Sequence, residues 1–128
     1  MLKAGFRYYL TSKKKYRTTL KEWLDDATKS FSRVYIINIA PTNPDIEYHS
    51  PGFSSSIREY NEIMNDVINK SGFSNVFLID IYHRILSSEY SFDELVSKED
   101  GHHITILAHQ LCNNELVRLD RQHVKINA

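Results

Sequence analysis

Apolar positions along the chain follow two alternating periodicities, which predict alternating helices and strands. Residues 12–31 place apolar side chains at steps of three and four, the spacing of an amphipathic helix, with Ser12 as its N-cap. Trp23 lies on this apolar stripe, so we expect it in the core. Residues 34–39 then form a short, β-branched, nearly continuous apolar run. Such a run is typical of a strand that is buried on both faces of a parallel sheet.

The same order recurs in the middle of the chain. Residues 40–55 carry all three prolines and a Pro-Gly pair, which indicates a loop. Ser56 and Glu59 have the spacing of a capping box, so a second helix is predicted to begin there and to stop at Gly72. Residues 76–80 form the second buried-type strand. A helix between two such strands indicates a right-handed parallel crossover.

The last third of the chain is more polar before it becomes helical again. A short helix is expected around residues 92–96, followed by a turn at residues 100–103. Thr105 is predicted to cap a final amphipathic helix in which Cys112 is a small buried residue. The overall order predicts an α/β fold, a parallel sheet with helices on both faces. Two strands make a thin sheet, so either residues 5–10 add a strand or the chain is part of a larger unit.

Composition narrows the classes of function. The 128 residues fit a single domain spanning residues 1–128, and 16 basic residues balance 16 acidic ones. A net charge of zero gives no reason to expect nucleic acid or an anionic membrane as a partner. One cysteine excludes an intrachain disulfide, and there is neither an apolar run long enough for a membrane span nor a signal-peptide core. We therefore expect a cytoplasmic protein.

The turn at residues 100–103 is the strongest candidate for chemistry. Asp100 and His103 are three residues apart with Gly101 between them, so the carboxylate can reach the imidazole Nδ1–H and leave Nε2 as a general base. Spacing alone favours a simple Asp-Gly turn with a surface histidine. The position of the pair, after two buried strands and before a capped terminal helix, favours a functional interpretation because such loops collect functional groups in parallel α/β sheets.

These residues also resemble a known family. Residues 100–105, Asp-Gly-His-His-Ile-Thr, look like the last conserved block of SGNH/GDSL hydrolases. The pair at 108–109 resembles the Gly-His pair in the final helix of that family, with Ala in place of Gly. Residues 36–41, 57–61 and 76–80 are similar, in order, to its strand with a proline loop, its I-x-x-Y-N helix and its V-x-x-x-D strand. The resemblance covers roughly residues 12 to 120.

The resemblance implies a three-layer, flavodoxin-like sheet whose N-terminal strands are missing, so that the chain is the C-terminal part of an SGNH-like domain. It implies ester hydrolysis or acyl transfer on a small-molecule or O-acylated carbohydrate ester, without a cofactor. Asp100 and His103 would be the Asp-x-x-His part of a Ser-His-Asp triad. The sequence departs from the family because it contains no Gly-Asp-Ser block, and residues 54–56 form a serine cluster without the glycines of a nucleophile turn.

Three alternatives are open. The chain can be a non-catalytic fragment that binds through its open sheet edge, either as a homodimer or with a complementing N-terminal segment. A zinc site from Asp100, His103 and His109 is disfavoured because a six-residue step does not put both histidines on one helical face, so no metal is predicted. Asp80 and His83 form a second Asp-x-x-His, which we interpret as a strand end followed by a loop histidine.

Overall fold

The computed structural model describes residues 11–127, so the strand that the sequence allowed within residues 5–10 lies outside the described part. The elements are, in order, α2 (Lys13–Ser30), β1 (Val34–Ile37), α3 (Ile46–His49), α4 (Phe53–Ser71), β2 (Val76–Ile79), α5 (Ile81–Leu86), α6 (Phe92–Leu95) and α7 (Ile106–Asn127). Helices and strands thus alternate as the hydrophobic pattern predicts. None of the helices in residues 11–127 combines the length and apolar character that crossing a membrane requires.

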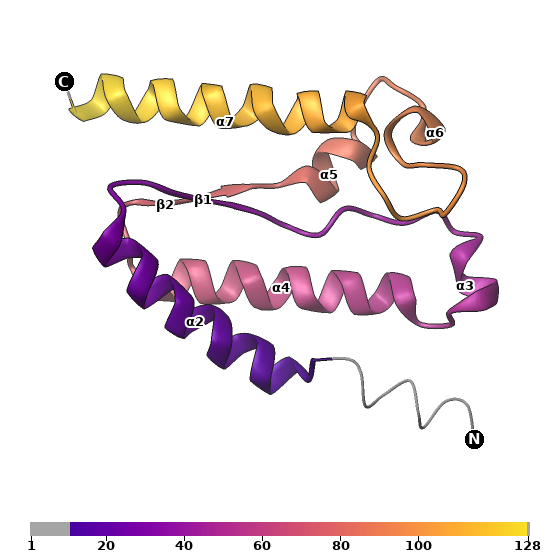
Figure 1. Cartoon of the computed structure of the whole chain (residues 1–128), viewed down its shortest axis with the longest axis horizontal. Helices are drawn as coiled ribbons and strands as arrows, with labels where there is room; N and C mark the ends of the chain where they lie inside the picture. The colour runs from indigo at the N-terminus through magenta and orange to yellow at the C-terminus, as the bar shows by residue number, and fades with distance from the viewer. Residues whose placement is uncertain (1–10, 128) are drawn as a thin grey trace.

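The two strands form a parallel pair, in register from Val34 opposite Val76 to Ile37 opposite Ile79. The helices lie on both sides of this sheet: α2 and α4 on one side, and α7 on the other (Figure 1). Because the two strands are parallel, their carboxyl ends lie at the same edge of the sheet. The loop after β1, helix α5 and the beginning of α7 gather at that edge (Figure 1). The predicted α/β class and parallel pairing are confirmed.

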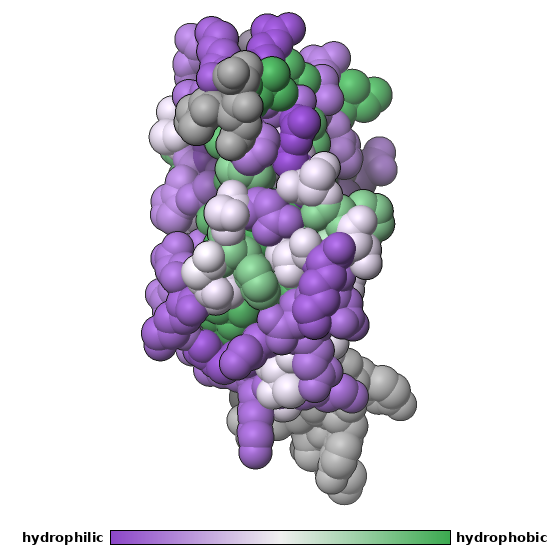
Figure 2. Space-filling view, turned by 90° about the vertical axis from the view of Figure 1, so that its left-hand side faces the viewer, coloured by the Kyte–Doolittle hydropathy of each residue, from purple (hydrophilic) through white to green (hydrophobic). Residues whose placement is uncertain are grey.

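Two apolar clusters hold these layers together. The larger one joins α2, α4 and one face of the sheet, and its buried members are Leu24, Ala27, Val34, Ile36, Ile63, Met64, Val67 and Val76. The smaller one joins α5, α6 and the start of α7, and its buried members are Ile81, Ile85, Leu95, Val96, Ala108 and Cys112. Cys112 is therefore the small buried residue that the pattern predicts. The end of the molecule where the strands begin is mostly hydrophilic, with smaller apolar areas between the polar side chains (Figure 2).

Two expectations about burial are wrong. Trp23 is 52% exposed, because Leu24 and Ala27 point into the core and the indole lies one position, about 100°, away from Leu24 around the helix. β1 is not buried on both faces, since Ile37 is 49% exposed. On that face the burial lies on the β2 side, where Phe77 contacts Tyr35 in a stacked arrangement and His123 of α7 edge-on, and where Ile79 is 1% exposed. The far end of β1 is left uncovered.

The start of α4 also differs from the prediction. The helix begins at Phe53, after Gly52 with a φ of 86°, so Ser56 lies inside the helix and does not cap it. The N–H groups at the start of α4 are instead capped by Glu47 of α3. The Glu47 carboxylate accepts hydrogen bonds from the N–H of Gly52 and of Ser54, both at 2.8 Å. The predicted stop at Gly72 is confirmed, with a φ of 70° in the left-handed region.

The unpaired side of β1 is closed off at Ile39 by a side chain of α4. Val34 and Asn38 donate their backbone N–H groups to the β2 side, so by alternation Tyr35, Ile37 and Ile39 turn their backbone groups away from β2. At Ile39 these groups are occupied: its N–H donates to Oδ1 of Asn61 at 2.9 Å, and its carbonyl accepts from Nδ2 of Asn61 at 2.8 Å. Asn61 is buried in α4, and both halves of its amide are satisfied by this one residue.

Candidate active site

The turn before α7 is attached to the loop after β1. Gly101 donates its N–H to the carbonyl of Ser97 at 2.9 Å, and its own carbonyl accepts the N–H of Asn43 at 2.8 Å. The N–H of Ser97 in turn donates to the carbonyl of His103 at 2.8 Å. Gly101 has a φ of 74°, which an L side chain rarely adopts. The chain therefore holds this turn at the edge of the sheet where both strands end.

Asp100 and His103 are in direct contact, as the sequence predicts. Oδ1 of Asp100 accepts the backbone N–H groups of His102 and His103, both at 2.9 Å. Oδ2 lies 2.5 Å from Nδ1 of the His103 ring. With Nδ1–H as the donor, the neutral imidazole keeps its lone pair on Nε2. Four residues of one turn thus fix both the orientation and the tautomer of the ring.

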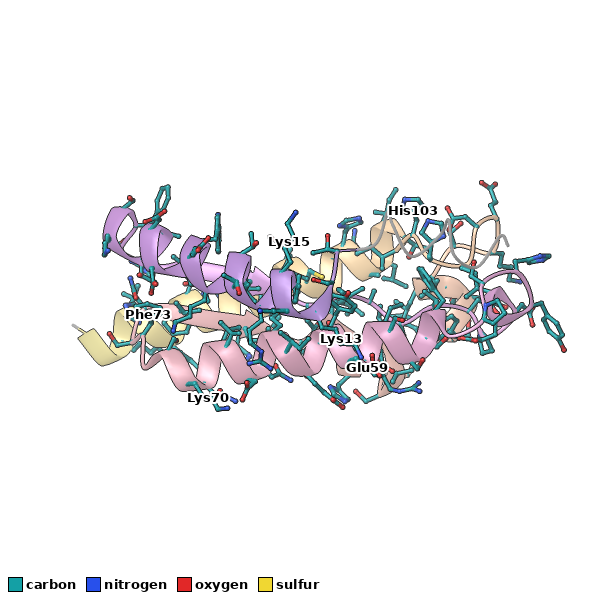
Figure 3. All side chains as sticks on the ribbon, turned by 90° about the horizontal axis from the view of Figure 1, so that it is seen from below. Lys13, Lys15, Glu59, Lys70, Phe73 and His103 are labelled. Carbon is teal, nitrogen blue, oxygen red and sulfur yellow. The ribbon has the colours of Figure 1, made fainter. Side chains whose placement is uncertain are left out.

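The electrostatics keep this pair in the form that acid–base chemistry needs. Hydrogen bonds from the backbone N–H of His103 and of His102, and then from the His103 ring, hold the pKa of the Asp100 carboxyl far below its ordinary value. The carboxylate is therefore ionised at neutral pH and can stabilise a positively charged imidazole. The His103 side chain is 72% exposed and lies on the loop that leads into α7 (Figure 3). The ring is therefore largely accessible from outside.

A nucleophile is not part of this arrangement in residues 11–127. No serine, threonine or cysteine side chain in the described chain hydrogen-bonds to the His103 ring. Ser54, in the serine cluster, has its hydroxyl 3.4 Å from that of Thr42, and its N–H is taken up by Glu47. The described residues therefore provide a histidine and its orienting carboxylate without a hydroxyl or thiol hydrogen-bonded to the ring.

A second histidine–carboxylate pair lies at the end of β2. Nδ1 of His83 is 2.7 Å from Oδ2 of Asp80, and the backbone N–H of His83 donates to Oδ1 at 3.1 Å. Asp80 caps α5, so His83 is in the first turn of a helix and not in the loop that we predicted. The spacing of Ile81 and Ile85, four residues apart, is the signal that could have revealed this helix.

The buried Asn38 at the end of β1 joins this second pair and was missed in the sequence. Its Nδ2 donates to Oδ1 of Asp80 at 2.8 Å, and its Oδ1 accepts the N–H of Tyr82 at 3.1 Å. Burial opposes ionisation of Asp80, but the hydrogen bonds from Asn38 and from His83 outweigh it, so the pKa of Asp80 is lowered. Asn38 ties the ends of both strands to α5, which gives this pair a structural role.

His102 is the other residue that sequence reasoning passed over. Nδ1 of its ring lies 3.1 Å from the carbonyl oxygen of Asp100, and its ring centroid is 4.3 Å from that of His103. Asp100, His102 and His103 bring three metal-ligating atoms within 4.8 Å of one another. The predicted alternative set contained His109 instead, which is an exposed residue in the first turn of α7. The local turn, and not the helix, assembles the group that could hold a metal.

The arrangement of parallel strands between helices also occurs in solved structures of enzymes. The fold is similar to that of one such enzyme, LAE5, an alpha/beta hydrolase from the metagenome of Lake Arreo, Spain, with a TM-score of 0.65 at 18% sequence identity. The match covers 86% of this chain and 48% of LAE5, so the chain spans about half the length of that enzyme. No protein family and no curated protein matches the sequence. At this identity the likeness is one of fold.

Proposed function

We propose that the chain carries the acid–base part of an SGNH-type serine hydrolase or acyltransferase, with His103 as the general base and Asp100 as its orienting carboxylate. The observation that supports this most directly is the 2.5 Å contact between Nδ1 of His103 and Oδ2 of Asp100, on a side chain that is 72% exposed. The hydrolase-like fold, and the family resemblance of residues 100–105, point the same way. The ester is a small molecule or an O-acylated carbohydrate.

The chemistry assigned to the pair follows from its geometry. Nε2 of His103 takes the proton of a serine hydroxyl while the serine oxygen attacks the ester carbonyl. The proton then passes to the departing alcohol, and the acyl group stays on the serine until water or an acceptor hydroxyl removes it. Asp100 remains ionised throughout and stabilises the imidazolium. The serine has to be supplied by a Gly-Asp-Ser segment, which this sequence does not contain.

The test is to supply an N-terminal segment bearing a Gly-Asp-Ser block, in cis or in trans, and to measure hydrolysis of a nitrophenyl acetate. We expect turnover that a serine-directed reagent abolishes and that His103→Ala lowers by at least about a hundredfold, which is the contribution typical of a general base. His83→Ala is the matched control, because His83 makes a similar contact with a carboxylate in the first turn of α5. Equal turnover of wild type and His103→Ala would discard the assignment.

A second candidate function, binding without catalysis, is favoured by the uncovered end of β1. Ile37 and Ile39 are 49% and 40% exposed, and in the described chain β1 is paired on one side only. An apolar open strand is suited to pairing with another strand. Sedimentation of the chain at several concentrations separates the two functions. A dimer that Ile37→Lys dissociates, while the control Ile106→Lys, at a side chain that is 78% exposed, does not, would favour binding; a monomer at all concentrations would exclude self-pairing.

A further inference from the structure

We propose that Asp100, His102 and His103 form a binding site for a divalent transition-metal ion, of the Zn²⁺ or Ni²⁺ class. This inference does not depend on the proposed hydrolase function. Each of these residues offers one nitrogen or oxygen atom that can bind a metal, and these atoms all lie within 4.8 Å of one another. Among residues 11–127, this is the group of three metal-ligating side chains that lie so close together. The argument concerns their spacing, their anchoring and their chemistry.

The spacing is close to what a metal ion imposes. Zinc binds nitrogen and carboxylate oxygen at about 2.0–2.2 Å, so two ligand atoms of a tetrahedral site lie roughly 3.4 Å apart. Oδ2 of Asp100 is 2.5 Å from Nδ1 of His103, and the ligand atoms of all three residues lie within 4.8 Å of one another. The existing distances bracket the required one. Both rings are exposed, and their planes are inclined by 40°, so each can rotate about its side-chain bonds to adjust the spacing.

The carboxylate is held ready for such an ion. Oδ1 of Asp100 is fixed by the N–H groups of His102 and His103, which leaves Oδ2 as the free ligand once the ring proton departs. Gly101 is anchored to Ser97 on one side and Asn43 on the other, so the turn does not need to order itself on binding. All three ligand residues are exposed, which leaves the remaining coordination positions to water.

The ligand types select the class of ion. Two imidazole nitrogens and one carboxylate suit Zn²⁺, Ni²⁺ or Cu²⁺, whereas Ca²⁺ and Mg²⁺ prefer sites made of oxygen alone. The chain contains an internal comparison: Asp80 and His83 have the same spacing and a similar contact of 2.7 Å, but Tyr82 stands where the first turn has His102. With two ligand residues, the Asp80 turn is expected to bind a metal ion only weakly. The third ligand residue, His102, is expected to strengthen binding at the Asp100 turn.

The experiment is a calorimetric titration of the untagged chain with NiCl₂ and with ZnCl₂. We expect one saturable site, weakened at least about tenfold by His102→Ala and by His103→Ala, since even loss of a supporting partner costs about 10–100-fold in affinity. Circular dichroism of each variant checks that it is folded. His102 and His103 are exposed, so neither substitution removes core packing.

The controls decide between this site and others. His83→Ala and His109→Ala are expected to bind within about twofold of wild type, because neither residue belongs to the set. CaCl₂ is expected to produce no saturable heat. Equal affinity of wild type and His102→Ala would overturn the proposal, as would a larger loss in His83→Ala. Because the readout is metal binding, failure here says nothing against the hydrolase proposal, and loss of esterase activity says nothing against the metal site.

Discussion

Replacing Gly101 with alanine tests whether the turn that carries Asp100 and His103 is as constrained as its geometry implies. An L residue with a φ of 74° costs about 1–2 kcal/mol. The new Cβ would also lie 3.3 Å from Cβ of Asn43, which is tighter than ordinary packing. The two segments of the chain cannot easily move apart there, because a backbone hydrogen bond of 2.8 Å joins them. We therefore expect Gly101→Ala to lower the free energy of unfolding by about 2–3 kcal/mol.

Gly72 provides the matched control. Its φ of 70° is nearly the same, but an added Cβ would meet nothing within 4 Å. Gly72→Ala should therefore show the backbone cost alone, about 1–2 kcal/mol. Urea unfolding followed by circular dichroism measures both variants, and amide NMR shifts of His102 and His103 report whether the turn has moved. A Gly101→Ala protein that loses no more stability than Gly72→Ala would refute the reasoning.

Three further predictions concern other parts of the fold. Leu24→Ala removes a fully buried side chain and should cost about 2–5 kcal/mol in urea unfolding, whereas Leu86→Ala, at a side chain 55% exposed, should cost under about 1 kcal/mol. Glu47→Ala removes the acceptor for two N–H groups at the start of α4 and should lower the midpoint of thermal unfolding. The pKa of Asp80 is lowered in the folded state, so it contributes stability above its unfolded pKa of about 3.9, and that contribution is lost as the pH falls through the folded pKa. Asp80→Asn should therefore flatten the loss of stability below about pH 4; an unchanged acid limb in urea titrations at several pH values would contradict this.

The sequence predicted those features that depend on a repeating pattern or on near neighbours. The apolar runs at 34–39 and 76–80 have no helical period, and each contains a strand. The contact between Asp100 and His103 was predictable because the two residues are three positions apart in a single turn. The stop of α4 at Gly72 was predictable for the same reason, since the left-handed conformation is a local property of glycine.

Features that depend on more distant parts of the chain were missed. The cap of α4 comes from Glu47, which is five and seven residues from the groups it binds, whereas the local rule pointed to Ser56. The role of Asn38 requires that the ends of β1 and β2 be adjacent, and single-sequence patterns contain no such pairing. Trp23 was misplaced because a helical stripe indicates a direction but not how wide the neighbouring surface is.

Asn61 sets a limit on anything that extends the sheet beyond β1. The backbone N–H and carbonyl groups of Tyr35 and Ile37 face the side on which an added strand would pair. At Ile39 the side-chain amide of Asn61 already makes the two hydrogen bonds that a neighbouring strand would make. An added strand can therefore pair with β1 only as far as Ile37. The position of Asn61 thus sets the register of that pairing, whatever the sequence of the added strand. Asn61→Leu would lift that restriction and leave the N–H and the carbonyl of Ile39 without the hydrogen bonds that Asn61 provides.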